Sequence, residues 1–298
     1  MTEPFLRARH RDADDTAADY PPLPDPLVVP VYDNHTHLEI EDGPGLDGTG
    51  SLDYREQLDR ASSVGVRGVV QVGTDLETSR WSAEIAAQEP RVLAAVALHP
   101  NEAPELAAQG LLDEHLAGIA DLAAQPRVRA IGETGLDFFR TGEDGREAQI
   151  RSFETHIAIA KEHDLALQIH DRDAHDDVLR VLRRVGAPER TVFHCFSGDA
   201  EFAREVADAG WYLSFAGTVT FKNAGSLRDA LDAVPRANIL IETDAPYLTP
   251  TPWRGRPNSS YLIPHTLRFM AEHLGTDAGE LATQISANTE RVYGSWAD

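Results

Sequence analysis

The sequence predicts an α/β fold, a (β/α)8 TIM barrel, on the basis of three observations. Short apolar or β-branched runs alternate about eight times with longer segments of helical periodicity, which is the element order of such a barrel. Residues able to bind a divalent cation recur where the predicted strands end. The first predicted strand leads into two histidines rather than a glycine-rich phosphate turn, so a doubly wound open sheet is the second choice.

The predicted elements follow one another in regular order. The strands are Leu27–Asp33, Val66–Val72, Val92–Leu98, Val128–Glu133, Leu165–His170, Thr191–His194, Trp211–Phe215 and Asn238–Asp244. The helices lie near residues 53–63, 77–88, 105–124, 146–163, 174–185, 200–209, 225–233, 261–274 and 278–293. The charged, proline-rich residues 1–27 are predicted to form a mobile N-terminal arm ahead of a single domain over residues 28–298.

The composition limits the class of protein. With 49 acidic and 27 basic residues, the formal net charge is −22, which argues against a protein that coats DNA non-specifically. A nuclease stays open, because bound divalent cations can dominate the field inside a site. The single cysteine, Cys195, excludes an internal disulfide and fits a reducing compartment. Without a signal-peptide pattern or a long apolar stretch, we expect a cytoplasmic protein with no membrane partner.

Histidines and carboxylates stand at the carboxyl ends of five predicted strands. His35 and His37 are two residues apart, so both side chains point to the same side of an extended strand. In a parallel barrel these strand ends converge on the face where barrel enzymes place their sites. The predicted metal ligands are His35, His37, Glu133, His170, His194 and Asp244.

Six ligands exceed the needs of one tetrahedral site and suit two metals that share a carboxylate. Glu133, in the middle of the barrel order, is the natural bridge, whereas Lys161 and Lys222 are poorly placed to act as a bridging lysine. Taken alone, each histidine could be a hydrogen-bonded core residue, and Asp244 could cap a helix. Imidazole with carboxylate does not distinguish among Zn, Mn, Fe and Ni, and Mg can also serve.

Other residues are predicted to support the site. Glu242 shares its side of the strand with Asp244 and is expected to orient a ligand histidine from behind, unless an irregular strand end turns it outward. Arg172 and Arg254 are candidate phosphate contacts, because guanidinium groups match phosphate geometry, although each could also be a solvated surface arginine. Lys222 and His99 are further candidates for contact with substrate.

Taken in order, these segments resemble the TatD family of metal-dependent deoxyribonucleases, from Asp33 to Asn288. The most specific pieces are Ile131–Asp137, His194–Gly198 and Glu242–Leu248. The resemblance implies two divalent metals, the first held by His35, His37, Glu133 and Asp244 and the second by Glu133, His170 and His194. It also implies hydrolysis of DNA phosphodiesters, often as a 3′-to-5′ exonuclease on single strands, whereas some relatives act on other esters, including aminoacyl-tRNA.

The sequence therefore predicts a hydrolase that cleaves single-stranded DNA or a nucleotide substrate with a metal-activated water. Asp244 and Glu133 are the expected catalytic carboxylates, and Asp244 is the expected general base. Two alternatives stay open: a metal-dependent hydrolase of a lactone, an aminoacyl ester or an amide, and a non-catalytic metal-binding module. The mode of cleavage and the oligomeric state are not indicated by the sequence.

Overall fold

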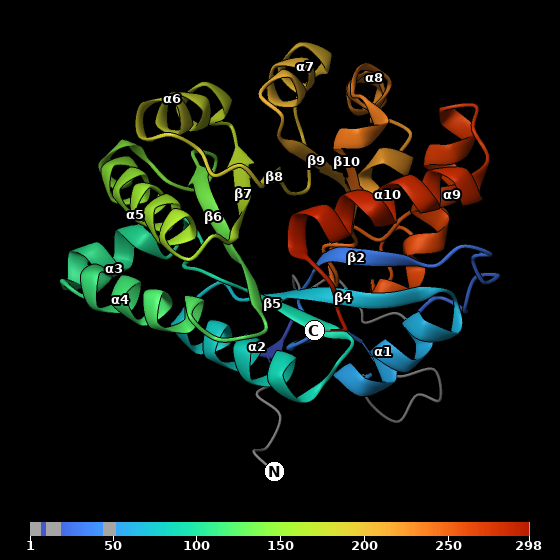
Figure 1. Cartoon of the computed structure of the whole chain (residues 1–298), viewed down its shortest axis with the longest axis horizontal. Coiled ribbons are helices and arrows are strands. Elements are labelled where there is room, and N and C mark those ends of the chain that lie inside the picture. The colour runs from blue at the N-terminus through green and yellow to red at the C-terminus, as the bar shows by residue number, and fades with distance from the viewer. Residues whose placement is uncertain (1–6, 10–18, 44–51, 298) are drawn as a thin grey trace.

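A computed structural model of the chain describes residues 7–9, 19–43 and 52–297, and it contains the predicted barrel. Eight parallel strands form one sheet in the order β2-β4-β5-β6-β7-β8-β9-β10, and the helices lie around the outside of the strands (Figure 1). The strands are β2 (Val31–Thr36), β4 (Val66–Val72), β5 (Val92–Val96), β6 (Val128–Asp137), β7 (Ala166–Arg172), β8 (Thr191–Phe193), β9 (Tyr212–Phe215) and β10 (Ile239–Ile241).

Helices fill the connections between these strands. They are α1 (Tyr54–Ser63), α2 (Leu76–Gln88), α3 (Ala103–Gln109), α4 (Leu112–Ala123), α5 (Glu143–Glu162), α6 (His175–Val185), α7 (Ala200–Asp208), α8 (Gly225–Ala233), α9 (Ile263–His273) and α10 (Ala278–Tyr293). Short 3-10 helices are η1 (Gly217–Thr220), η2 (Arg236–Asn238) and η3 (Ser260–Leu262). Aspartates start several helices because their carboxylates accept the first backbone N–H groups, as Asp53 and Asp277 do.

The sheet is nearly closed between its first and last strands. An isolated parallel bridge joins Thr36 to Ala245. Next to it, the backbone N–H of Asp244 donates to the His35 carbonyl at 2.9 Å, and that of His37 donates to the Ala245 carbonyl at 2.8 Å. The closure therefore holds together the two chain segments that carry three of the predicted metal ligands.

Several predicted boundaries were wrong for local reasons. The helix predicted near residues 105–124 is two helices, because Gly110 adopts a left-handed φ of 72° and ends α3. The first strand begins at Val31, directly after Pro30, which lacks a backbone donor. The last strand ends at Ile241, three residues before Asp244, whose own φ is 53°.

Parts of the N-terminal arm contact the barrel, while the mobility expected of the arm stays a prediction. Tyr20 is buried, and the Tyr261 hydroxyl donates to the Pro21 carbonyl at 2.5 Å. A two-residue strand, β1 (Arg7–Ala8), pairs in parallel with β3 (Ile40–Glu41). Burial of an aromatic side chain and backbone pairing hold these parts in place, whereas residues 1–6 and 10–18 lie outside the described residues.

Two apolar layers stabilise the barrel. The outer layer packs the sheet against the helices, and the inner layer fills the interior with alternate strand residues such as Val70, Leu93 and Ala130. Tyr293, at the end of α10, and Trp296 belong to the inner layer, and Trp296 stacks on Tyr32 with a ring separation of 4.1 Å. These aromatic side chains fill one part of the interior, which leaves the carboxyl ends of the strands to form a site.

No helix in the described part of the chain combines the length and the apolar character needed to cross a lipid bilayer.

Candidate metal centre

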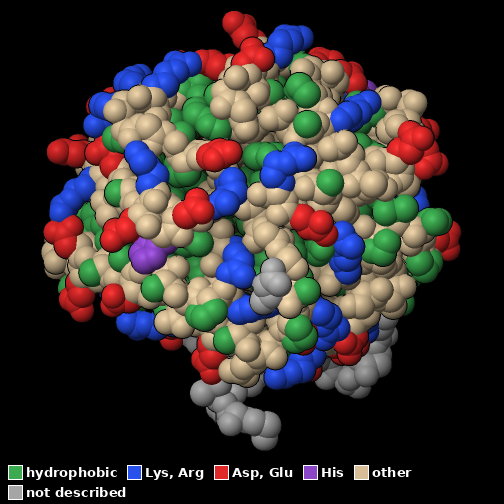
Figure 2. All heavy atoms as spheres, viewed as in Figure 1, with side chains coloured by type: hydrophobic (Ala, Val, Ile, Leu, Met, Phe, Trp, Pro, Cys, Tyr) green, Lys and Arg blue, Asp and Glu red, His purple; other side chains and the backbone are tan. Residues whose placement is uncertain are grey.

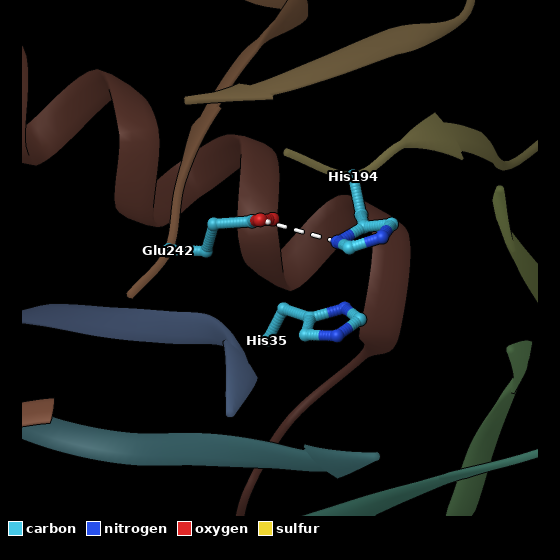
Figure 3. A group of neighbouring side chains, drawn as sticks. All are labelled: His35, His194 and Glu242. Atoms are coloured by element: carbon cyan, nitrogen blue, oxygen red, sulfur yellow. Dashed lines mark hydrogen bonds and ion pairs between the residues drawn. The ribbon is translucent and has the colours of Figure 1, made fainter. Parts of the chain in front are cut away.

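The alternation of side chains along the strands points the predicted ligands into the barrel. The inner apolar layer includes Ala166 of β7, Val192 of β8 and Leu240 of β10. His170, His194 and Glu242 stand an even number of residues further along, so their side chains face the same interior at its carboxyl end. His35, His194 and Glu242 come from three different strand ends and lie together in Figure 3.

Glu133 reaches the centre of this group because β6 is irregular at that point. The pairing of β6 with β7 shifts register between Ile131 and Thr134, on either side of Glu133. Gly132 allows the close approach, since a Cβ atom there would stand 2.4 Å from the Cβ of Gln168. Glycine is therefore required next to the central carboxylate.

One oxygen of Glu133 faces the histidine pair of β2. Its Oε2 lies 3.3 Å from Nε2 of His35 and 3.7 Å from Nε2 of His37. Asp244 Oδ1 lies 3.5 Å from Nε2 of His37 and 3.8 Å from Nε2 of His35. Two imidazoles and two carboxylate oxygens thus surround one small volume.

The other oxygen of Glu133 faces a second set of histidines. Its Oε1 lies 2.8 Å from Nδ1 of His170 and 3.3 Å from Nε2 of His194, and these two nitrogens are 3.5 Å apart. His99 Nε2 lies 3.1 Å from the same oxygen. The Glu133 carboxylate therefore stands between two separate donor groups.

Burial and mutual charge determine how the cluster titrates. Burial alone would raise the pKa of the Glu133 carboxyl, but His194, His99 and a hydrogen bond from His170 hold that pKa well below its ordinary value. Burial lowers the pKa of His37, but Asp244, Glu39 and Glu133 outweigh burial and raise it to about 9. Glu133 thus keeps its charge, and His37 holds a proton that a cation can displace.

Glu242 lies behind two of the histidines and is completely buried. Its Oε1 accepts a hydrogen bond from the backbone N–H of Cys195 at 2.7 Å and lies 3.3 Å from Nδ1 of His194 (Figure 3). Its Oε2 and Nδ1 of His35 are buried without a hydrogen-bond partner. β10 ends at Ile241, just before Glu242, and an irregular strand end could have turned this side chain outward. Glu242 nevertheless faces His194.

Two further carboxylates, which were not predicted from the sequence, contact the cluster. Asp137 Oδ2 lies 3.3 Å from Nε2 of His170 and accepts a hydrogen bond from the Asn101 side chain at 3.1 Å. Glu39 is buried, with its Oε1 3.8 Å from Nδ1 of His37. A signal was present for both, because Asp137 shares a strand with Glu133, and Glu39 stands two residues after His37.

The predicted phosphate contacts lie outside this cluster. Arg172 and Arg254 are exposed, and their guanidinium groups lie over the rings of Phe139 at 3.9 Å and Phe221 at 4.4 Å, respectively. Within the described ranges, no side-chain hydrogen bond or ion pair joins either arginine to the metal-binding cluster. Lys222 is exposed and lines a surface hollow beside α9.

Charge is mixed on one face of the molecule. On the face that Figure 2 shows, Lys and Arg side chains are interspersed with Asp and Glu rather than gathered in one area. That face therefore presents a polyanionic ligand with a mixture of charges.

The family described as "TatD related DNase" matches residues 32–294 of the chain. The "Uncharacterized metal-dependent hydrolase TatD" of Mycobacterium tuberculosis is 44% identical over 268 residues, which cover 89% of this chain and 98% of the relative. The "3'-5' ssDNA/RNA exonuclease TatD" of Citrobacter rodentium is 34% identical over 81% of this chain and 92% of its own length. The crystal structure of YJJV, a TatD homolog from Escherichia coli, superposes with a TM-score of 0.77 at 27% identity and covers 89% of this chain and 98% of that one.

Proposed function

Because this chain belongs to the TatD family of metal-dependent hydrolases, we propose that it is a deoxyribonuclease that cleaves phosphodiester bonds of single-stranded DNA from the 3′ end. The name of the Citrobacter rodentium relative, an exonuclease on single-stranded DNA and RNA, supports this substrate class. The observation that carries the proposal is the Glu133 carboxylate, whose two oxygens face separate donor groups.

Two divalent ions fit the donor set. His35, His37, Asp244 and Oε2 of Glu133 would hold one ion, and Oε1 of Glu133, His170 and His194 would hold the other. The chemistry of the donors supports this fit, because imidazole nitrogens and carboxylate oxygens are ordinary ligands of catalytic divalent metals. When bound, such a pair lowers the pKa of a water and neutralises charge on the scissile phosphate.

The residues of the chain then have separate tasks. Asp244 Oδ1 lies beside the histidine pair of β2 and would accept the proton of the attacking water as general base. His99 lies on the opposite side of Glu133 and would contact a substrate oxygen there. Arg172, the exposed last residue of β7, and Arg254, in an exposed turn after β10, would bind flanking phosphates rather than the scissile one.

A hydrolase of lactones or aminoacyl esters is the second candidate. The observation that favours it is the net charge of −22, which suits a small substrate at least as well as a nucleic acid strand.

The decisive assay offers the purified protein a single-stranded oligonucleotide labelled at either end, beside lactone and aminoacyl ester substrates. The proposal predicts stepwise shortening from the 3′ end, loss of activity with a chelator, and recovery on adding a divalent metal. Asp244→Asn should reduce kcat by about 100-fold or more, whereas Asp121→Asn, an exposed position on α4, should not. Turnover of the esters alone would replace the nuclease with the second candidate.

A further inference from the structure

A short N-terminal segment lies beside the candidate metal centre. Residues 7–9, here called the strap, run along β3: the N–H of Arg7 donates to the Glu39 carbonyl and that of Arg9 to the Glu41 carbonyl, both at 2.8 Å. β3 begins three residues after His37. The strap is therefore held by backbone hydrogen bonds next to the turn that follows the first pair of predicted ligands.

Arg9 connects Asp42, directly after β3, to the loop that follows β10. Its Nη1 donates to Asp42 Oδ2 at 2.8 Å and to the Pro246 carbonyl at 3.0 Å. Its guanidinium lies 5.0 Å from the centre of the Tyr247 ring, which in turn meets the His37 ring edge-on at 6.3 Å. A single arginine thus joins the segment that follows His37 to the segment that follows Asp244, and it packs on the aromatic ring beside His37.

The strap also changes the charge at one side of the barrel mouth, the opening at the carboxyl ends of the strands. Arg7 forms an ion pair with Asp75, the cap of α2 just after β4, at 2.8 Å, and approaches Glu77 at 3.5 Å. Arg9 pairs with Asp42, whose side chain is only 1% exposed. The strap therefore brings two positive charges to carboxylates that follow the carboxyl ends of β2 and β4, where an anionic substrate would otherwise be repelled.

The strap lies outside the part of the chain that matches the family. The TatD family match begins at residue 32, and the Mycobacterium tuberculosis relative covers 89% of this chain although 98% of its own length is matched. The contacts of Arg7 and Arg9 are therefore not explained by the features that this chain shares with the family.

We propose that the strap is part of the substrate-binding site, in which Arg9 positions Tyr247 beside the metal centre and makes the mouth accept anionic, phosphate-bearing substrates. This inference rests on the proposed function, because it presumes a phosphodiester substrate. It assigns Arg9 to substrate binding and leaves metal binding and proton transfer to the residues inside the barrel.

The test compares Arg9→Gln with the wild-type full-length protein, using bis(p-nitrophenyl) phosphate and a single-stranded oligonucleotide as substrates. For Arg9→Gln, KM should rise by about three- to ten-fold while kcat stays within about two-fold, because the lost charge acts on binding. The dependence of kcat/KM on salt should become weaker, since one positive charge has left the mouth. Arg9→Lys should recover most of the loss, and Arg204→Gln, an exposed position on α7, should match the wild type.

The outcomes separate this inference from the proposed function. If the wild type hydrolyses neither phosphodiester, both are overturned. If the wild type is active and Arg9→Gln has the same KM and salt dependence, only the role of the strap is overturned. A folded Arg9→Gln protein with reduced metal content would also overturn it, because Arg9 would then act on the metal centre rather than on substrate.

Discussion

Replacing Glu242 with glutamine tests whether a buried carboxylate fixes the geometry of the metal ligands. Its Oε1 accepts from the Cys195 backbone at 2.7 Å and lies 3.3 Å from Nδ1 of His194. Metal binding through Nε2 of His194 requires the proton on Nδ1, and a carboxylate at that distance favours this tautomer. Glutamine keeps the volume and the contact with Cys195 but loses the negative charge that holds the imidazole.

The magnitude follows from the kind of interaction that is lost. Removing the partner of a ligand histidine reduces metal affinity or activity by about 10- to 100-fold, which corresponds to about 1.4 to 2.7 kcal/mol. The assay is a competition titration with a chromophoric chelator on the metal-free protein, with kcat measured on the loaded protein. Glu162→Gln, at the exposed end of α5, is the matched control. If Glu242→Gln binds metal within about two-fold of the wild type, Glu242 is only a buried structural residue and the reasoning fails.

Three further predictions use the same structure. Burial lowers the pKa of His156 to about 4, against 6.5 in the unfolded chain, so the unfolded chain binds more protons between those pH values. Unfolding in urea should therefore show about 3 kcal/mol of stability lost as the pH falls from 6.5 to 4, and His156→Gln should remove that pH dependence. Gly135 has a φ of 138°, and a Cβ atom there would stand 2.1 Å from the His170 carbonyl oxygen. Gly135→Ala should therefore lower the free energy of unfolding in urea by at least about 2 kcal/mol, and a loss below about 0.5 kcal/mol would contradict the steric argument. Because the pKa of the His37 imidazole is raised to about 9 without metal, a proton competes with the cation. Isothermal titration should therefore give an apparent metal affinity that rises at least about ten-fold per pH unit from 7 to 9, and a flat profile would refute the competition.

Much of the fold followed from patterns that are local in the sequence. The alternation of short strands and helices predicted the barrel, and the parity of side chains predicted that His35 and His37 would share one side. These inferences succeeded because strand periodicity and the parallel order of a barrel are set by near neighbours. The position of Glu133 between two groups of donors also agrees with its expected role as a bridge, which stays a prediction until metals are observed.

Other features depend on contacts between distant segments and were not predictable. The mobility expected of the charged, proline-rich residues 1–27 stays a prediction, but two contacts of this segment had no signal in the sequence: Tyr20 is buried, and Arg9 meets Asp42 and Pro246. Nothing in the local sequence reports such a partner, because the partner is brought there by the fold. The ends of the last strand and of α3 were misjudged for a related reason, since single residues with left-handed backbone conformations interrupt otherwise regular patterns.

The number and position of the metals test the proposed two-metal site most directly. A crystal of the metal-loaded protein, measured at the absorption edge of the added metal, should show two anomalous peaks about 3.5 to 4 Å apart, one on each side of the Glu133 carboxylate. His35, His37 and Asp244 should contact one peak, and His170 and His194 the other. A single peak, or two peaks that Glu133 does not bridge, would contradict the proposed two-metal site.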